Sequence, residues 1–497
     1  MTVASIETTF HDGAREKYSK QANAGSPTRT RWSRPVAADI VGLGDATAIL
    51  LGAGVPATIH TTFGSLEIPA TTIIRIALLV AVIVYLCLRN WNMYPTNGMH
   101  DFPVRPLALF SALAIAMVAV IGIGLPFNQG NFFHAWIWSL SWFGASFLLL
   151  LANRGLANVT LAWLTRSGRF DTRIAVFGAG EVAHRVHLHL RDSKLGIALA
   201  GVYDDRKDED RRDDAGLEIS GRLDDLLRAG RSGEIDEIII ALPQAAARRI
   251  AQIALSLEQL PVSIHIVTHI SSDFVSSSSA HKVSGLGSVG LLDVKSKPLS
   301  DWSPLIKRIE DYGLGLIFLI LALPLIGIIA LLIKLESSGP VFFRQHRRGL
   351  NQKVIDVIKF RTMTVLENGP DIKQATENDP RITGVGWWLR RTSLDELPQL
   401  INVLKGEMSI VGPRPHAVAH DEAWEQLMAQ YSNRHQVKPG ITGLAQVRGL
   451  RGITHDNNSI EERVRNDLEY IAKWSLWLDI KIICRTLVTI FNGRNAH

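Results

Sequence analysis

Charged residues are scarce in this sequence. They make up 20% of its 497 residues, against about 25% in an average soluble protein. Between Leu107 and Asn153 there is no Asp, Glu, Lys or Arg at all. A charge-free stretch of this length cannot face water, so the composition excludes a wholly soluble chain and also a disordered one. At roughly 100–200 residues per domain, the length allows two to four domains.

Cysteines and dense basic stretches are also lacking. The two cysteines, Cys87 and Cys484, lie far apart, which excludes a disulfide framework and a cysteine-based zinc site. The net charge is only +6, and the basic residues flank apolar segments instead of forming one stripe. This pattern argues against a nucleic-acid partner and favours contact with anionic lipid head groups.

A polar tail precedes four apolar segments. Residues 1–34 carry six Lys/Arg and no apolar run, which predicts a disordered cytosolic tail and not a signal peptide. Residues 35–153 are predicted to form four transmembrane helices of about the 20 residues that a bilayer requires, at 36–59, 68–88, 107–126 and 133–152. Lys and Arg are confined to alternate loops, which places the N-terminus and everything after the fourth helix in the cytoplasm.

Residues 154–172 are predicted to be a linker, and residues 173–300 a Rossmann-like α/β domain. Strand-like and helix-like stretches alternate here, as is typical of a parallel sheet. Gly178 and Gly180 follow the first strand and Asp204 ends the second, as in a dinucleotide fingerprint. Two interpretations stay open: these residues bind a nucleotide, or the domain is a structural unit that has lost its ligand.

A fifth apolar segment, residues 313–333, has Pro324 at its centre and basic residues beyond both ends. A helix that crosses the membrane would carry one basic cluster outside, against the positive-inside bias. A helix broken at a proline can instead enter one leaflet and return. We therefore predict a re-entrant helix hairpin over residues 301–336, with a plain fifth span as the alternative.

The strongest candidates for chemistry lie in residues 337–497. Asp395 and Glu396 are adjacent near a predicted helix start, shortly after Arg390. Such a pair can simply cap a helix. However, neighbouring side chains on a helix point about 100° apart, so one carboxylate could attack while the other holds a divalent ion. Mg²⁺ prefers one or two carboxylates together with substrate phosphates.

Further basic and polar residues occupy strands and Pro- or Gly-containing turns of the same region. They are Lys359, Arg361, Arg381, Arg414 and Gln446. Each alone is typical of a surface or a turn, but together they indicate an anion site for a polyphosphate. The amphipathic helix predicted at the C-terminus, residues 474–491, either lies in the lipid head-group plane or belongs to the domain core.

These motifs resemble the bacterial sugar transferase family over residues 301–497. Its members are monotopic phosphoglycosyl transferases, and the whole chain is similar to the long form of the family. The resemblance implies a membrane bundle of four α-helical spans, a Rossmann-like α/β domain, and a re-entrant helix with a small α/β catalytic domain. Residues 474–481 are most similar to the branch of undecaprenyl-phosphate glucose phosphotransferases.

The resemblance also implies a reaction in the bacterial inner membrane, with the catalytic domain on the cytoplasmic face. A hexose 1-phosphate, with glucose expected first, would pass from a UDP-sugar to undecaprenyl phosphate and release UMP. This step starts repeat units of exopolysaccharide, capsule or O-antigen. A homodimer is compatible with the family, and galactose 1-phosphate is the alternative cargo.

Roles of individual residues follow from the same resemblance. Asp395 would be the nucleophile that forms a covalent aspartyl sugar-phosphate, Glu396 would bind Mg²⁺, and Arg390 would hold a phosphate. Lys359, Arg361, Arg381, Arg414 and Gln446 would bind the nucleotide sugar, and Pro324 would break the re-entrant helix. A membrane-anchored NAD-dependent dehydratase is a competing class. It needs a Tyr-x-x-x-Lys pair on a helix, and the only match, Tyr203 and Lys207, lies at a strand end.

Overall fold

The computed structural model of the chain describes residues 34–62, 69–94, 102–124, 132–167, 172–192, 197–206, 217–268, 283–286, 289–364, 379–416, 418–428, 430–450 and 457–491. These residues fall into two compact units. The N-terminal helices make up one unit, while the α/β domain and the C-terminal domain belong to the other.

The N-terminal unit contains the four apolar helices that the sequence predicts: α2 (Arg34–Thr62), α3 (Ala70–Asn90), α4 (Pro106–Gly124) and α5 (Phe132–Arg166). Segments of α2, α3 and α5 are long and apolar enough to cross a membrane, and α4 is shorter. The predicted linker at 154–172 is wrong in its first part, because α5 continues without a break to Arg166.

A buried ion pair explains why α5 continues past the predicted boundary. Arg154 donates to the Asp45 carboxylate at 2.6 Å, and both side chains are buried. Tyr94 and Asn153 each donate to the same carboxylate at 2.7 Å. A charge inside a membrane bundle is costly unless it is paired. Asp45 therefore does not weaken α2 as a span, and Arg154 belongs to the bundle.

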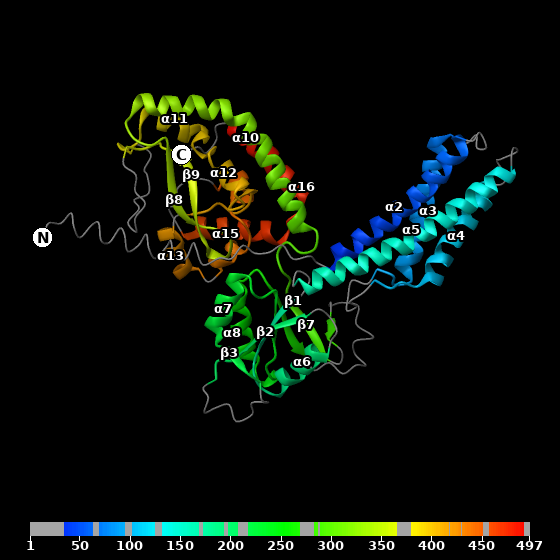
Figure 1. Cartoon of the computed structure of the whole chain (residues 1–497). Helices are drawn as coiled ribbons and strands as arrows, with labels where there is room; N and C mark the ends of the chain where they lie inside the picture. Colours follow the sequence, from blue (N-terminus) through cyan, green and yellow to red (C-terminus); the bar gives the residue numbers. More distant parts are fainter. Residues whose placement is uncertain are drawn as a thin grey trace. The chain divides into compact units, whose positions relative to one another are not determined.

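The α/β domain, which carries the labels β1, β2, β3 and β7 in Figure 1, is built on a seven-stranded mixed sheet in the order β3-β2-β1-β4-β5-β7-β6. The strands are β1 (Thr172–Phe177), β2 (Ile197–Tyr203), β3 (Ile219–Gly221), β4 (Glu237–Ile240), β5 (Ser263–Thr268), β6 (Val283–Leu286) and β7 (Val289–Lys295), and the helices α6 (Glu181–Asp192), α7 (Leu223–Ser232) and α8 (Ala247–Leu257) connect them. The pairs of β1 with β4 and of β4 with β5 are parallel, as predicted. The sequence pattern did not predict that β7 pairs antiparallel with β5 and β6.

The glycine-rich turn of this domain is formed, but its acidic partner is already engaged. Gly178 has φ +115, a conformation that favours glycine, and a side chain there would meet the Ala241 carbonyl. Asp204 accepts hydrogen bonds from the Ala179 amide and from the Arg206 guanidinium, both at 2.9 Å. The Asp204 carboxylate, which the sequence predicts to bind a ribose, is therefore already hydrogen-bonded within the domain. This favours the interpretation that the α/β domain is a structural unit without a ligand.

The C-terminal domain begins with the long helix α10 (Ser303–Glu336), which contains Pro324. The break predicted at Pro324 is a bend within one continuous helix (Figure 1). A proline in a helix removes one backbone hydrogen bond and clashes with the preceding turn, which is enough to kink the helix without ending it.

Both ends of α10 contact the same domain. Near its start, Asp311 accepts a hydrogen bond at 3.0 Å from the backbone amide of Ile410. Near its end, Ile329 and Ile333 pack against Phe360 in a buried cluster. The large apolar side chains between these contacts are mostly exposed: Leu316, Ile317, Ile320, Leu321, Leu323, Leu325 and Ile328. The middle of the helix therefore presents an apolar surface while both ends are held on the domain.

The remaining elements form a small α/β domain. The antiparallel pair β8 (Phe342–Arg348) and β9 (Val354–Phe360) is one sheet, and the parallel pair β10 (Ser409–Val411) and β11 (Gly440–Thr442) is the other. The helices are α11 (Gly384–Thr392), the short 3₁₀ helix η5 (Leu394–Glu396), α12 (Gln399–Leu404), α13 (Val418–Leu427), the 3₁₀ helix η6 (Tyr431–Gln436), α14 (Leu444–Val447), α15 (Asn457–Ala472) and α16 (Leu476–Phe491).

Candidate active site

The acidic pair Asp395–Glu396 lies in a sharp turn after α11. The Thr383 hydroxyl caps the start of α11 by accepting from the Gly386 amide at 2.9 Å. The Glu336 carboxylate, at the end of α10, accepts from the Val385 amide at 3.1 Å. After the last turn of α11, Ser393 adopts a left-handed conformation with φ 60 and redirects the chain into η5. The end of α10 therefore fixes the start of α11, and the acidic pair follows directly after α11.

Glu396 is buried between two cations. Lys359, near the end of β9, donates to Oε1 of Glu396 at 2.8 Å. The Arg414 guanidinium, in the turn after β10, donates to Oε1 at 2.6 Å and to Oε2 at 3.0 Å. Burial opposes ionisation of Glu396, but Arg414 and Lys359 outweigh this effect and hold its pKa well below the ordinary value.

Asp395 has the opposite electrostatic environment, although it is the next residue in the chain. Burial and the neighbouring Glu396 charge raise its pKa above 3.8, while Lys359 and two arginines oppose the shift. No described side chain donates a hydrogen bond to the Asp395 carboxylate, and the residue is partly exposed. Adjacent carboxylates with diverging pKa values are typical of two different chemical roles.

Two further predicted residues belong to this cluster. Arg390, in the last turn of α11, lies close enough to lower the pKa of Asp395 and contacts the Met363 sulfur at 3.6 Å. Arg414 pairs with Glu396 as described. The sequence predicts Arg390 as a phosphate ligand and Arg414 as a ligand of the nucleotide sugar. Together with Lys359, they form the part of the predicted anion site that the structure brings together.

Arg347 completes the cluster and was not predicted. It lies on β8, where Phe343 pairs with Lys359 and Arg347 pairs with Ile355. Alternate residues of a strand share a face, so Arg347 and Lys359 lie on the same side of this sheet. Burial and the nearby Arg414 lower the pKa of Arg347 to about 10. Alternation along the strand is the signal in the sequence that could reveal this residue.

Two arginines, the half-buried Arg347 and the buried Arg434, donate hydrogen bonds to the backbone of the turn that carries Arg414. Arg347 donates to the Pro415 carbonyl. Arg434, in η6, donates to the Arg414 carbonyl at 2.6 Å and to the Asp467 carboxylate of α15 at 2.7 Å. These contacts fix the backbone at Arg414 and Pro415, and the two hydrogen bonds to Glu396 hold the Arg414 guanidinium in place before any ligand arrives.

Three predicted residues have hydrogen-bond partners outside the acidic pair, and their predicted roles as ligands of the nucleotide sugar stay predictions. Arg361 donates to the Ser337 and Ser338 carbonyls at the end of α10, at 2.8 and 2.7 Å. Arg381 pairs with Asp379 at 2.6 Å. Gln446 donates to the Ile441 carbonyl at 3.4 Å. Each side chain satisfies a local acceptor, and the structure does not bring any of the three to the acidic pair.

The side chains around the acidic pair decide whether the predicted Mg²⁺ ion could bind there. The described residues include no cluster of three or more His, Cys, Asp or Glu side chains that could hold a metal on their own. Mg²⁺, however, needs only one or two carboxylates when substrate phosphates supply further oxygens. Asp395 and Glu396 fit that requirement, although both oxygens of Glu396 accept from cations. The residues thus fit a Mg²⁺ ion that is shared with a diphosphate.

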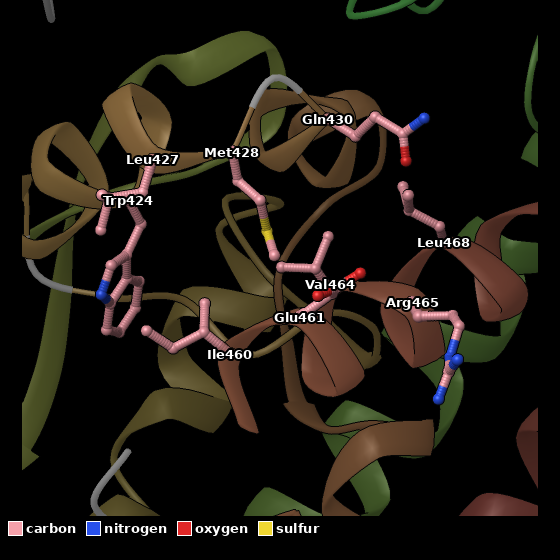
Figure 2. Close-up of a pocket in the computed structure, with 9 residues that line it drawn as sticks. All are labelled: Trp424, Leu427, Met428, Gln430, Ile460, Glu461, Val464, Arg465 and Leu468. Atoms are coloured by element: carbon pink, nitrogen blue, oxygen red, sulfur yellow. The ribbon is translucent and has the colours of Figure 1, made fainter. Parts of the chain in front are cut away.

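A separate cavity of about 570 Å³ lies between α13 and α15 (Figure 2). Its lining residues are Trp424, Leu427, Met428, Gln430, Ile460, Glu461, Val464, Arg465 and Leu468. Most of them are apolar, and the Met428 side chain points toward Val464 (Figure 2). The cavity includes no residue of the acidic pair or of the cations around it.

Comparisons with known proteins agree with this site. Residues 302–493 match the family described as bacterial sugar transferase. The chain is 41% identical over 358 residues to a UDP-glucose:undecaprenyl-phosphate glucose-1-phosphate transferase of Escherichia coli K12, covering 72% of this chain and 75% of the relative. A Klebsiella pneumoniae protein of the same name is 36% identical over 400 residues, 80% of this chain and 84% of the relative.

The chain belongs to the bacterial sugar transferase family. It is therefore an enzyme, and the predicted fold class of this sugar transferase is confirmed. Residues 103–268 also match a family described as CoA-binding domain, a range that takes in β1 to β5 of the α/β domain. The dehydratase alternative gains no support. Tyr203 ends β2, a strand, and Lys207 lies outside the described residues.

Proposed function

We propose that this sugar transferase passes glucose 1-phosphate from UDP-glucose to undecaprenyl phosphate and releases UMP. The observation that carries the proposal is the partly exposed Asp395 carboxylate beside Lys359, Arg390 and Arg414. The names of the relatives support glucose as the sugar. A Rhizobium leguminosarum relative, 47% identical over 188 residues, is named an exopolysaccharide production protein. This supports a role in starting an exopolysaccharide repeat unit.

The proposed reaction has two phosphoryl transfers. In the first, an Asp395 oxygen attacks the β-phosphorus of UDP-glucose, the bond to the bridging oxygen breaks, and UMP leaves. The second begins when an oxygen of undecaprenyl phosphate attacks the same phosphorus. The bond to Asp395 then breaks, which restores the carboxylate and gives undecaprenyl diphosphate glucose. A carboxylate nucleophile in this way divides one difficult transfer into two steps.

The cations stabilise the charge of the transferring group. Lys359, Arg390 and Arg414 surround the acidic pair, and Arg347 lies behind them. These four cations exceed the two carboxylates by two formal positive charges, which suits a diphosphate. Glu396 would hold Mg²⁺ together with diphosphate oxygens. A bound Mg²⁺ would neutralise charge on the leaving group.

The bent helix α10 supports a re-entrant position in the cytoplasmic leaflet of the inner membrane. Its two ends contact one domain, and the apolar side chains between them are exposed. Helix α16 has two faces: Ile482 is buried in the core, whereas Trp477 is 74% exposed. The exposed face suits the lipid head-group plane. Both features support a site at the membrane surface, where a soluble nucleotide sugar and a lipid-anchored phosphate can meet.

The test is a mass-spectrometric analysis of the lipid product. The full chain in membranes receives undecaprenyl phosphate and, in separate reactions, UDP-glucose, UDP-galactose and UDP-N-acetylgalactosamine. The proposal predicts undecaprenyl diphosphate hexose from UDP-glucose with the wild type and none with Asp395→Asn. A product formed from UDP-galactose alone would replace glucose by the alternative cargo, and a product with Asp395→Asn would contradict the role of that residue.

A further inference from the structure

The ion pairs of Glu396 occupy the position that a substrate phosphate requires. Lys359 and Arg414 make every hydrogen bond to Glu396 that is present among the described side chains. The two hydrogen bonds of the Arg414 side chain also both go to Glu396. A guanidinium binds a carboxylate and a phosphate through the same pair of parallel hydrogen bonds. The two cations cannot keep these contacts and also bind a diphosphate fully.

The same contacts compete with the binding of a metal. A carboxylate oxygen that accepts from two cations at 2.6 and 2.8 Å has little remaining capacity for Mg²⁺. The combined charge of Lys359 and Arg414 also repels a divalent ion. Removal of the Glu396 contacts without a replacement anion would leave two largely buried cations unpaired, since the Lys359 and Arg414 side chains are 14% and 25% exposed, and this is unfavourable. Only an incoming anion can therefore release Glu396 at low cost.

We propose that Glu396 acts as an internal stand-in for the substrate phosphate. In the free enzyme it pairs with Lys359 and Arg414. An entering nucleoside diphosphate takes over both cations, and the released carboxylate then becomes a ligand for the divalent ion. This inference rests on the proposed function, because it requires a diphosphate at this site. It predicts an order: the metal binds at Glu396 only after the nucleotide.

Two consequences follow from this exchange. Nucleotide binding without metal is weakened, because the nucleotide must first displace a carboxylate. Nucleotide and metal also raise each other's affinity by the same factor, as linkage between two sites requires. A metal site that is already formed in the free enzyme would instead bind the divalent ion with no nucleotide present.

The test compares the affinity of UDP for the wild type and for Glu396→Gln. The full chain in detergent is titrated with UDP by calorimetry, once with EDTA and once with excess Mg²⁺. With EDTA, Glu396→Gln should bind UDP about tenfold more tightly than the wild type, equivalent to roughly one charge-assisted hydrogen bond. With Mg²⁺ the order should reverse, because a neutral amide oxygen is a much weaker ligand for Mg²⁺ than a carboxylate. Glu469→Gln, which removes a half-buried carboxylate paired with Arg448, should match the wild type in both conditions.

An equal or lower affinity of Glu396→Gln in EDTA would overturn the exchange while leaving the proposed function intact. If the wild type bound no UDP in either condition, both the exchange and the proposed function would fail. A second measurement needs no substitution. Equilibrium dialysis of the wild type should show about one additional Mn²⁺ bound per chain when UDP is present. The same Mn²⁺ uptake with and without UDP would contradict the order.

Discussion

At the scale of single residues, the two neighbouring carboxylates of the site have different electrostatic environments. Glu396 is buried and paired with two cations, which keep its pKa low. Asp395 has no hydrogen-bond donor among the described side chains, and burial raises its pKa. The chain thus contains one carboxylate that is fixed in an ion-pair network and one that is free to attack. This difference supports Asp395, and not Glu396, as the nucleophile.

Lys359→Gln should move the pH dependence of the first step. Asp395 must be ionised to attack, so activity falls as the pH decreases through its raised pKa. Lys359 is the strongest of the charges that lower this pKa, and its removal should shift the acidic limb of kcat/KM for UMP release to higher pH. Lys473→Gln removes an exposed lysine paired with Glu469 and should leave the limb in place. An unmoved limb in Lys359→Gln would contradict this electrostatic account.

The sequence predicted the site only in part. Asp395, Glu396, Arg390, Lys359 and Arg414 come together as the motifs indicated. Arg361, predicted as a ligand of the nucleotide sugar, instead binds the carbonyl groups at the end of α10. A motif gives residue types and spacing but not the nearest acceptor of each side chain. That acceptor depends on contacts between distant parts of the chain.

At the scale of secondary-structure elements, the end of α10 and the start of α11 align the acidic pair. Apolar length and composition predicted α10 and the N-terminal helices. They could not predict that α5 extends to Arg166, because the partner of Arg154 is Asp45, more than one helix earlier in the chain. A bend instead of a break at Pro324 also depends on packing at both ends of α10.

Gly386→Ala tests the position of α11. Alanine normally stabilises a helix relative to glycine by about 1 kcal/mol. Here an added methyl group would overlap the Thr362 carbonyl, so the substitution should instead lower the free energy of unfolding by about 1–3 kcal/mol. UMP release should fall with it. Gly180→Ala has open space for its methyl group and serves as the control. Equal thermal stability of the two variants would show that α11 is not fixed at this contact.

At the scale of the whole molecule, the apolar residues serve two purposes. The helices of the N-terminal unit pack together around a buried core that includes Val80, Val84 and Leu113, as membrane anchors would. Helix α10 contacts the catalytic domain at both ends. The low overall charge is therefore an average over anchoring helices and a domain whose active site is rich in charge.

Cysteine labelling tests the re-entrant topology. Ser300 and Ser338 are exposed and flank α10. In a chain that also carries Cys87→Ser and Cys484→Ser, Ser300→Cys and Ser338→Cys should both react with an impermeant maleimide only after the membrane is opened. Ser65→Cys, in the loop after the first predicted span, should react in intact cells. Labelling of Ser338→Cys in intact cells would indicate that α10 crosses the membrane.

The most direct measurement of the central claim is the exchange of labelled UMP into UDP-glucose without a lipid acceptor. If Asp395 carries the sugar phosphate, the first step is reversible by itself and the wild type exchanges label with no undecaprenyl phosphate present. Asp395→Asn, folded and inserted in the membrane like the wild type, should show no exchange. Exchange by Asp395→Asn at the wild-type rate, or its absence from a wild type that still forms the lipid product, would contradict the covalent mechanism.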